Sequence, residues 1–259
     1  MKNSIKEHLF NLYGKGMHID GRRLDEYREI SIEYGISAKS AEGSARVKIG
    51  KTEVIVGIKL DLGEPFPDRP NEGSIIVNTE LRPICSWKYE SGPPGTDSIE
   101  LSRVVDRAIR EAHYLDFKKL CITPGEKIWM VFIDIYPLND DGNLFDASAL
   151  AALAALMDTK MPALIDGVID YKQKTDKGLP LKKDIPVSCT IVYCDGYMII
   201  DPTTEEEQFI DARLTIGFLD NGNICALQKG GDVGLSEEEL MKIVELAERK
   251  TIELRKYLK

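Results

Sequence analysis

The segment from Asp146 to Met157 restricts the fold of this 259-residue chain more than any other. It reads DASALAALAALM, so every residue except one aspartate and one serine is apolar. A helix that is apolar on every side must be surrounded by the rest of the protein. The sequence therefore predicts a central buried helix here. The preceding residues 139–143, NDDGN, predict the turn that leads into it.

Several segments have the residue types and spacing of β-strands. Residues 44–59 are rich in β-branched side chains and break at Gly50-Lys51, which predicts a hairpin. The nearly unbroken apolar run 127–136 is typical of a strand that is covered on both faces. Three more elements are predicted: a strand at 74–81 and hairpins at 189–200 and 212–229, with turns at Asp195-Gly196 and at 220–222.

Three further helices are predicted from apolar spacing and capping residues. The first covers residues 4–13, and the second is an amphipathic helix at about 98–113. The last begins at Ser236, because SEEE at 236–239 is a capping box. Strands therefore precede helices in both parts of the chain, which favours an α+β fold of two pseudo-repeated units.

A polar, lysine-rich stretch at 170–184 is the expected surface connection between these two units. We therefore expect one domain over residues 1–259. Its N-terminal half covers about 1–165 and its C-terminal half about 185–259.

Composition excludes several classes of function. Lys and Arg total 34 against 43 Asp and Glu, giving a net charge of −9. Such a chain does not coat nucleic acid non-specifically, so any RNA contact needs a local basic strip. The five cysteines form no CxxC motif, and with three histidines a zinc site is not expected. We expect reduced thiols, a cytoplasmic location and no membrane segment.

Motifs of the common catalytic classes are absent from the sequence. It contains neither a Gly-rich phosphate loop nor a G-x-S-x-G nucleophile elbow. The acidic clusters Asp140-Asp141 and 205–207 have the ligand type that Mg²⁺ prefers. They are more simply interpreted as a turn and a solvated loop. No metal and no cofactor are therefore expected.

Three arginines lie along one face of the helix at about 98–113. Arg103, Arg107 and Arg110 fall nearly opposite its apolar face and form a strip that matches phosphate groups. The same spacing also permits ion pairs within the helix. These pairs would be Glu100–Arg103, Asp106–Arg110 and Arg107–Glu111. The residues alone leave both interpretations open.

An ordered set of segments resembles the RNase PH superfamily, and specifically the exosome subunits of archaea. The segments are IDGRRLDEYR at 19–28, EGSA at 42–45, GSIIVNTEL at 73–81, IELSRVVDR at 99–107, DDGNLFDASA at 140–149 and IDPTTEEE at 200–207. They keep the family's order from near residue 19 to the final helix, so the resemblance covers nearly the whole chain.

The resemblance implies the RNase PH fold, a ribosomal S5 domain 2-like α+β architecture. It also implies a ring of six subunits in which two related chains alternate, together with S1/KH-type RNA-binding cap proteins. Catalytic members degrade single-stranded RNA from the 3′ end with inorganic phosphate and release nucleoside diphosphates. The chain could thus be the catalytic or the non-catalytic ring subunit.

The sequence departs from the phosphate-binding pattern of catalytic members. These carry a Gly-Thr/Ser-Arg signature after the Asp-Gly turn, where this chain has Leu144 and Phe145. A phenyl ring cannot form the charged hydrogen bonds that a phosphate needs. Catalytic members also carry a basic pair where this chain has Thr96 and Asp97.

The catalytic carboxylates are also replaced. The family's two catalytic aspartates align with Glu207 and Arg213, and a guanidinium can neither act as a base nor bind a metal ion. We therefore expect a non-catalytic subunit with no catalytic residue of its own. It would pair with the catalytic RNase PH-like subunit near a shared active site.

The resemblance favours RNA contact for Arg103 and Arg107. It does not decide whether Arg110 contacts RNA. Two other functions stay as alternatives. One is an active phosphate-dependent 3′-5′ exoribonuclease, and the other is a structural spacer without RNA contact.

Overall fold

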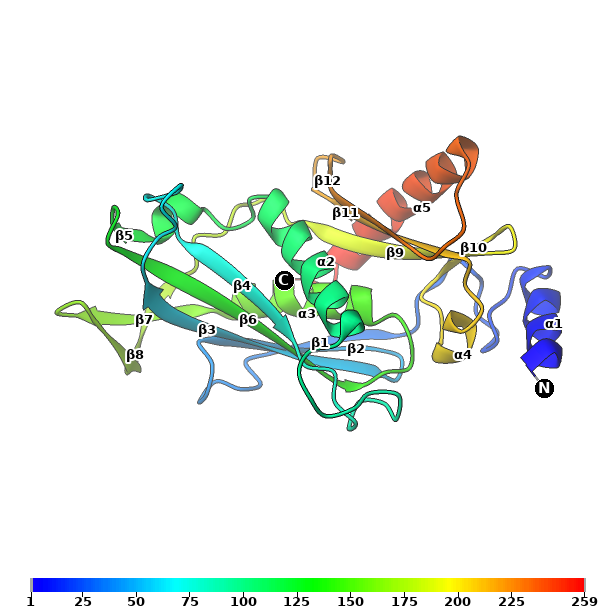
Figure 1. Cartoon of the computed structure of the whole chain (residues 1–259), viewed down its shortest axis with the longest axis horizontal. Coiled ribbons are helices and arrows are strands. Elements are labelled where there is room, and N and C mark those ends of the chain that lie inside the picture. Colours follow the sequence, from blue (N-terminus) through cyan, green and yellow to red (C-terminus); the bar gives the residue numbers. More distant parts are fainter. Residues whose placement is uncertain (1, 259) are drawn as a thin grey trace.

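Two β-sheets enclose helices α2 (Thr96–Glu111) and α3 (Leu144–Asp158) in residues 2–258, the part of the chain that the computed structural model describes (Figure 1). The larger sheet and α3 come from the first part of the chain, and the smaller sheet and α5 (Glu237–Arg255) from the last part. Helix α3 packs on the larger sheet and on the smaller one, while α2 lies along one edge of each. The predicted α+β class is confirmed.

The larger sheet has the order β1-β2-β3-β6-β4, with β5 paired to β6. All of its pairs are antiparallel except β4–β6, which is parallel. Its strands are β1 (Ile30–Tyr34), β2 (Gly43–Ile49), β3 (Thr52–Gly63), β4 (Ser74–Thr79), β5 (Cys121–Thr123) and β6 (Lys127–Asn139).

The smaller sheet is antiparallel and has the order β10-β9-β11-β12. Its strands are β9 (Val187–Cys194), β10 (Tyr197–Ile200), β11 (Ala212–Phe218) and β12 (Ile224–Gly230). A separate hairpin joins β7 (Lys160–Ile165) to β8 (Val168–Gly178). The remaining elements are α1 (Lys2–Tyr13), the 3₁₀ helix η1 (Phe117–Leu120) and α4 (Thr204–Glu207).

Helix α3 has the central position that its sequence predicts. Every residue from Asp146 to Leu156 is buried, and Leu144 is buried as well. Its side chains belong to one cluster that also includes buried residues of both sheets, such as Val56 of β3 and Ile191 of β9. One hydrophobic core therefore connects the two sheets through this helix.

The predicted hairpins at 44–59, 189–200 and 212–229 are confirmed, as are the capping box at Ser236 and the helices α1 and α2. Strand β4 is also confirmed, although it ends at Thr79. The division of the domain into halves at about 165 and 185 stays a prediction, and its terminal residues Met1 and Lys259 lie outside the described residues. No helix within residues 2–258 is long and apolar enough to cross a membrane.

Two predictions were wrong. Strand β6 is not covered on both faces, because its residues alternate between buried and partly exposed along most of its length. The stretch 170–184 is not all connection, since its first part forms β8. That strand pairs only with β7, so its side chains need no apolar alternation.

Candidate functional site

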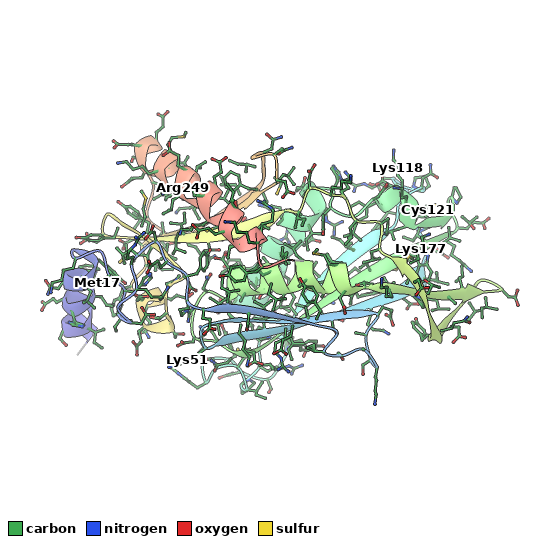
Figure 2. The ribbon with its side chains drawn as sticks, turned by 180° about the vertical axis from the view of Figure 1, so that it is seen from behind. Met17, Lys51, Lys118, Cys121, Lys177 and Arg249 are labelled. Carbon is green, nitrogen blue, oxygen red and sulfur yellow. The ribbon has the colours of Figure 1, made fainter. Side chains whose placement is uncertain are left out.

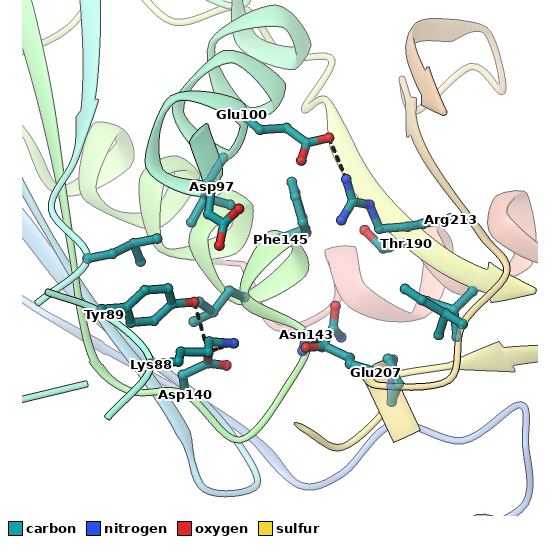
Figure 3. A pocket seen from close by; sticks show the side chains of 16 residues that line it. Lys88, Tyr89, Asp97, Glu100, Asp140, Asn143, Phe145, Thr190, Glu207 and Arg213 are labelled. Carbon is teal, nitrogen blue, oxygen red and sulfur yellow. Dashed lines mark hydrogen bonds and ion pairs between the residues drawn. The ribbon is translucent and has the colours of Figure 1, made fainter. Parts of the chain in front are cut away.

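A cavity of about 240 Å³ lies where the N-termini of α2 and α3 approach the smaller sheet (Figure 3). Five of the six residues that the resemblance predicts at former site positions line this cavity. They are Asp97, Leu144, Phe145, Glu207 and Arg213. Thr96 lines a neighbouring cavity of about 600 Å³, which shares Asp97 with the first. Positions that are up to 117 residues apart in sequence (96 and 213) therefore form one region, as the resemblance predicts.

Arg213 is held by the protein itself. Its Nη2 donates to Glu100 Oε1 at 2.5 Å, and its guanidinium lies 4.0 Å from the centre of the Phe145 ring. Figure 3 shows this side chain extending from β11 towards Glu100 on α2. The carboxylate and the aromatic face both stabilise the cation, so its charge is not available to a phosphate.

The second cation of the cavity is neutralised in the same way. Lys88 Nζ lies 2.7 Å from Asp140 Oδ2, and Tyr89 Oη donates to the same oxygen at 3.0 Å. Burial would lower the pKa of Lys88, but the hydrogen bond to Asp140 and its negative charge outweigh it and raise that pKa. Burial, reinforced by the charge of Asp140, raises the pKa of Tyr89 well above its usual range.

Glu207, which the resemblance predicts in place of a catalytic carboxylate, stabilises the start of α3. Its Oε1 accepts a hydrogen bond from the backbone N of Asn143 at 2.8 Å, and Asn143 adopts a left-handed conformation with φ of 60°. Burial raises the pKa of Glu207, and the nearby Asp140 adds to the increase. The carboxyl groups of Asp97, Glu100, Asp140 and Glu207 outnumber the two cations of the cavity, so the cavity repels a phosphate.

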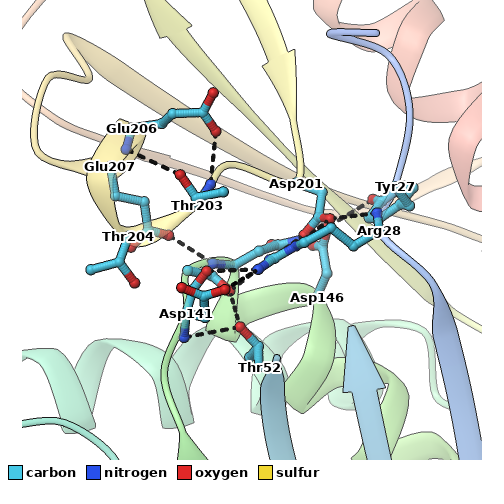
Figure 4. A network of polar contacts seen from close by, with 12 residues as sticks. Tyr27, Arg28, Thr52, Asp141, Asp146, Asp201, Thr203, Thr204, Glu206 and Glu207 are labelled. Carbon is cyan, nitrogen blue, oxygen red and sulfur yellow. Dashed lines mark hydrogen bonds and ion pairs between the residues drawn. The ribbon is translucent and has the colours of Figure 1, made fainter. Parts of the chain in front are cut away.

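The turn beside the cavity is fixed by a polar network (Figure 4). Arg28 binds Asp201 with two hydrogen bonds of 2.7 and 2.8 Å and donates to the carbonyl of Asp141 at 2.7 Å. Thr52 Oγ1 donates to the carbonyl of Gly142 at 2.6 Å. Gly142 has a φ of +89°, and a Cβ here would lie 2.3 Å from a backbone oxygen, so only glycine fits.

The comparison with family models agrees with this geometry. The two domains described as "3′ exoribonuclease family, domain 1" and "domain 2" match residues 26–162 and 184–250. The chain belongs to this family. The predicted RNase PH fold is thereby confirmed.

The most informative relatives of this RNase PH family are exosome components of archaea. The chain is 45% identical to the exosome complex component Rrp42 of Methanothermobacter thermautotrophicus over 98% of this chain and 93% of the relative. It is 44% identical to the exosome complex component Rrp42 of Thermococcus gammatolerans over 100% of this chain and 95% of the relative. This relationship confirms the prediction of a non-catalytic exosome subunit.

Two solved structures match the whole chain. A chain of the Archaeoglobus fulgidus exosome with RNA bound to the active site has a TM-score of 0.92 and 44% identity, and covers 100% of this chain and 99% of its own. A chain of an archaeal exosome core has a TM-score of 0.87 and 40% identity, covering 100% and 98%. Rice Rrp46, at 18% identity and a TM-score of 0.67, shares the fold.

The arginine strip of this family member lines a groove of about 440 Å³ between α2 and β4. Arg103 and Arg107 are exposed, and Arg107 Nη1 donates to Gln228 Oε1 of β12 at 2.9 Å. Arg110 is half-buried and binds Asp106 with two hydrogen bonds of 2.7 and 3.0 Å. The structure therefore brings all three arginines together, with Arg110 already paired.

Only one of the three predicted ion pairs along α2 forms. Asp106 pairs with Arg110, but the described residues include no Glu100–Arg103 and no Arg107–Glu111 pair. Glu100 instead binds Arg213, which is 113 residues away in sequence. Spacing along one helix cannot reveal such a partner.

The acidic clusters have protein partners. Asp141 lies 3.3 Å from Arg28, and the buried Glu206 is hydrogen-bonded at 3.0 Å to Nδ1 of the buried His18. The prediction that 205–207 is a solvated loop was wrong, because these residues belong to α4, which Glu206 also caps, and Glu207 accepts a hydrogen bond from the backbone N of Asn143. Within residues 2–258, no group of three or more His, Cys, Asp or Glu side chains could hold a metal ion.

Proposed function

We propose that this chain is the non-catalytic subunit of an exosome ring made of three heterodimers. It pairs with a catalytic RNase PH-like subunit, shapes that subunit's active site and helps to bind single-stranded RNA during 3′-to-5′ phosphorolysis. Its Rrp42 relatives, which are named exosome complex components, support this assignment over nearly the whole length.

The neutralised cations of the cavity carry the proposal. Phosphorolysis requires a cationic clamp on inorganic phosphate. In the cavity, Arg213 is bound to Glu100 and Lys88 to Asp140. Binding a phosphate here would require breaking both ion pairs, so the alternative of an active exoribonuclease is not supported.

RNA contact is assigned to Arg103 and Arg107. They are exposed on α2 and have no ion pair among the described residues, whereas the chain as a whole is acidic with a net charge of −9. An exposed guanidinium can bind the RNA backbone without breaking a structural contact. Arg110 takes a smaller part, because Asp106 neutralises it.

The proposal also includes the cap proteins and the location that the family resemblance implies. S1/KH-type RNA-binding proteins form the cap of the ring, and the assembly is placed in the cytoplasm. All five cysteines are free, which agrees with a reducing compartment.

Assembly is the direct test of this proposal. The chain and its catalytic RNase PH-like partner are purified separately, mixed and measured by light scattering. The mixture should have the mass of three copies of each chain, while this chain alone should stay smaller. A stable homohexamer of this chain would contradict the proposal.

A further inference from the structure

Three grooves meet at Arg110 and continue the arginine strip beyond α2. The first is the groove between α2 and β4 that Arg103 and Arg107 line. The second, of about 200 Å³, contains Arg69, and the third, of about 440 Å³, contains His113, Lys118 and Lys182. Because Arg110 lines all three grooves, a strand of RNA that lies in the first groove can continue into the third.

The third groove has an excess of positive charge on an otherwise acidic protein. Among the residues that line it, the permanent cations are Arg69, Arg110, Lys118 and Lys182, and the carboxylates are Glu72 and Asp116. Arg69 lies 3.7 Å from Asp68 and Arg110 pairs with Asp106, so the excess comes from the two lysines. Asp116 lies 3.1 Å from Lys119, which neutralises it. Lys118, which Figure 2 labels, and Lys182 are both exposed and have no ion pair among the described residues.

The walls of this groove are held at fixed positions by backbone hydrogen bonds. The N of Gly73 donates to the carbonyl of Phe117 at 2.8 Å, and the N of Lys182 donates to that of Tyr114 at 2.8 Å. A Cβ at position 73 would lie 2.4 Å from the Cβ of Leu120, so glycine permits this close packing. These hydrogen bonds therefore hold the backbone segments that carry the two lysines in fixed positions.

We propose that Lys118 and Lys182, with Arg69 beside them, bind backbone phosphates of single-stranded RNA that has passed the arginine strip. This proposal rests on the proposed function and extends its RNA path. The cations are exposed, come from three separate segments and line one open groove. A polyanion gains affinity on such a surface because each contact releases counterions.

The test compares the assembled ring with a ring whose chain carries Lys118→Ala and Lys182→Ala. RNA affinity is measured over a salt series with single-stranded RNAs of increasing length. For long RNA, the slope of log affinity against log salt should fall by roughly 0.7 per lost contact. For RNAs too short to pass Arg110, the two rings should bind equally. Inorganic sulfate, which cannot support phosphorolysis, should leave the difference between the two rings unchanged at the concentration of RNA phosphates.

The matched control is a ring with Lys15→Ala and Lys51→Ala. Both lysines are exposed, line none of the three grooves and have no ion pair among the described residues. The charge change is the same as in the test variant, but it lies outside the grooves. This control should therefore bind long RNA like the wild type.

Four results would overturn the extended path. One is that the Lys118/Lys182 variant and the wild type bind long RNA equally, while Arg103→Ala with Arg107→Ala weakens binding. The proposed function would then hold and only the extension of the RNA path would be wrong. The second is an equal loss of affinity in the Lys15/Lys51 control. The third is loss of the difference between the two rings in inorganic sulfate, which would indicate a small-anion site. The last is failure of the variant to form the ring, which would show that the groove is a subunit contact.

Discussion

Arg213 illustrates how a basic side chain can line the cavity and yet be unable to bind phosphate. The family resemblance implies that catalytic members have an arginine where this chain has Phe145. Here the cation comes from β11 instead, lies on the Phe145 ring and binds Glu100. The ring and the carboxylate therefore turn a phosphate site into a structural contact between α2, α3 and the smaller sheet.

At the two exposed arginines, we predict a change in RNA binding with little change in stability. Arg103→Ala with Arg107→Ala should alter the free energy of unfolding by only about 0.5 kcal/mol per site, because both side chains are exposed. In the assembled ring, the slope of log RNA affinity against log salt should fall by roughly 0.7 for each lost contact. Coincident salt curves for an intact ring would favour a spacer without RNA contact.

Asp146 should make stability depend on pH. Burial raises the pKa of this carboxyl group to about 7 in the folded chain, against a usual value of 3.8. Its Oδ2 accepts hydrogen bonds from Tyr27 Oη at 2.7 Å and Asn143 Nδ2 at 3.2 Å. Between these two pH values the folded state keeps the proton and the unfolded state loses it, so this contribution to stability falls as pH rises.

The variant Asp146→Asn isolates that contribution, since the amide keeps the shape of the protonated acid and cannot titrate. The free energy of unfolding of the wild type minus that of the variant should fall from about pH 4 to about pH 7 and then level off. Urea unfolding of both chains over this pH range measures the difference. A difference that is constant or rises with pH would show that Asp146 is ionised in the folded chain.

Among the elements, α5 depends on the N-cap residue that precedes it. Ser236 accepts a hydrogen bond from the backbone N of Glu239, and the Glu239 side chain accepts one from the backbone N of Ser236. Ser236→Ala should therefore destabilise the chain by about 1 kcal/mol in denaturant unfolding. Ser40→Ala, at an exposed serine outside any helix, should change it by less than about 0.5 kcal/mol. Equal effects of the two substitutions would mean that the cap contributes nothing.

Elements with a strong apolar pattern or a turn signal could be predicted from the sequence. Helix α3 and the three hairpins that were predicted belong to this group, because burial or a Gly turn determines their residue types. The hairpin β7–β8 and strand β1 were missed. Strand β8 reads VIDYKQKTDKG and pairs with one neighbour only, so no buried face imposes alternation on it.

For the whole molecule, the position of the site could be predicted but its internal contacts could not. The family resemblance identified the replaced residues, and five of the six line one cavity. The partners that neutralise its cations lie far away in sequence: Lys88 binds Asp140, and Glu100 binds Arg213. Such pairs depend on how the two sheets close around α3, which no local pattern encodes.

The central claim, that this chain contributes to an active site without having one, is tested most directly by release of nucleoside diphosphate. Single-stranded RNA and inorganic phosphate are incubated with this chain, with its catalytic partner, and with both. We predict no release by this chain alone and robust release only when both chains are present. Robust phosphorolysis by this chain alone, free of partner, would contradict the account.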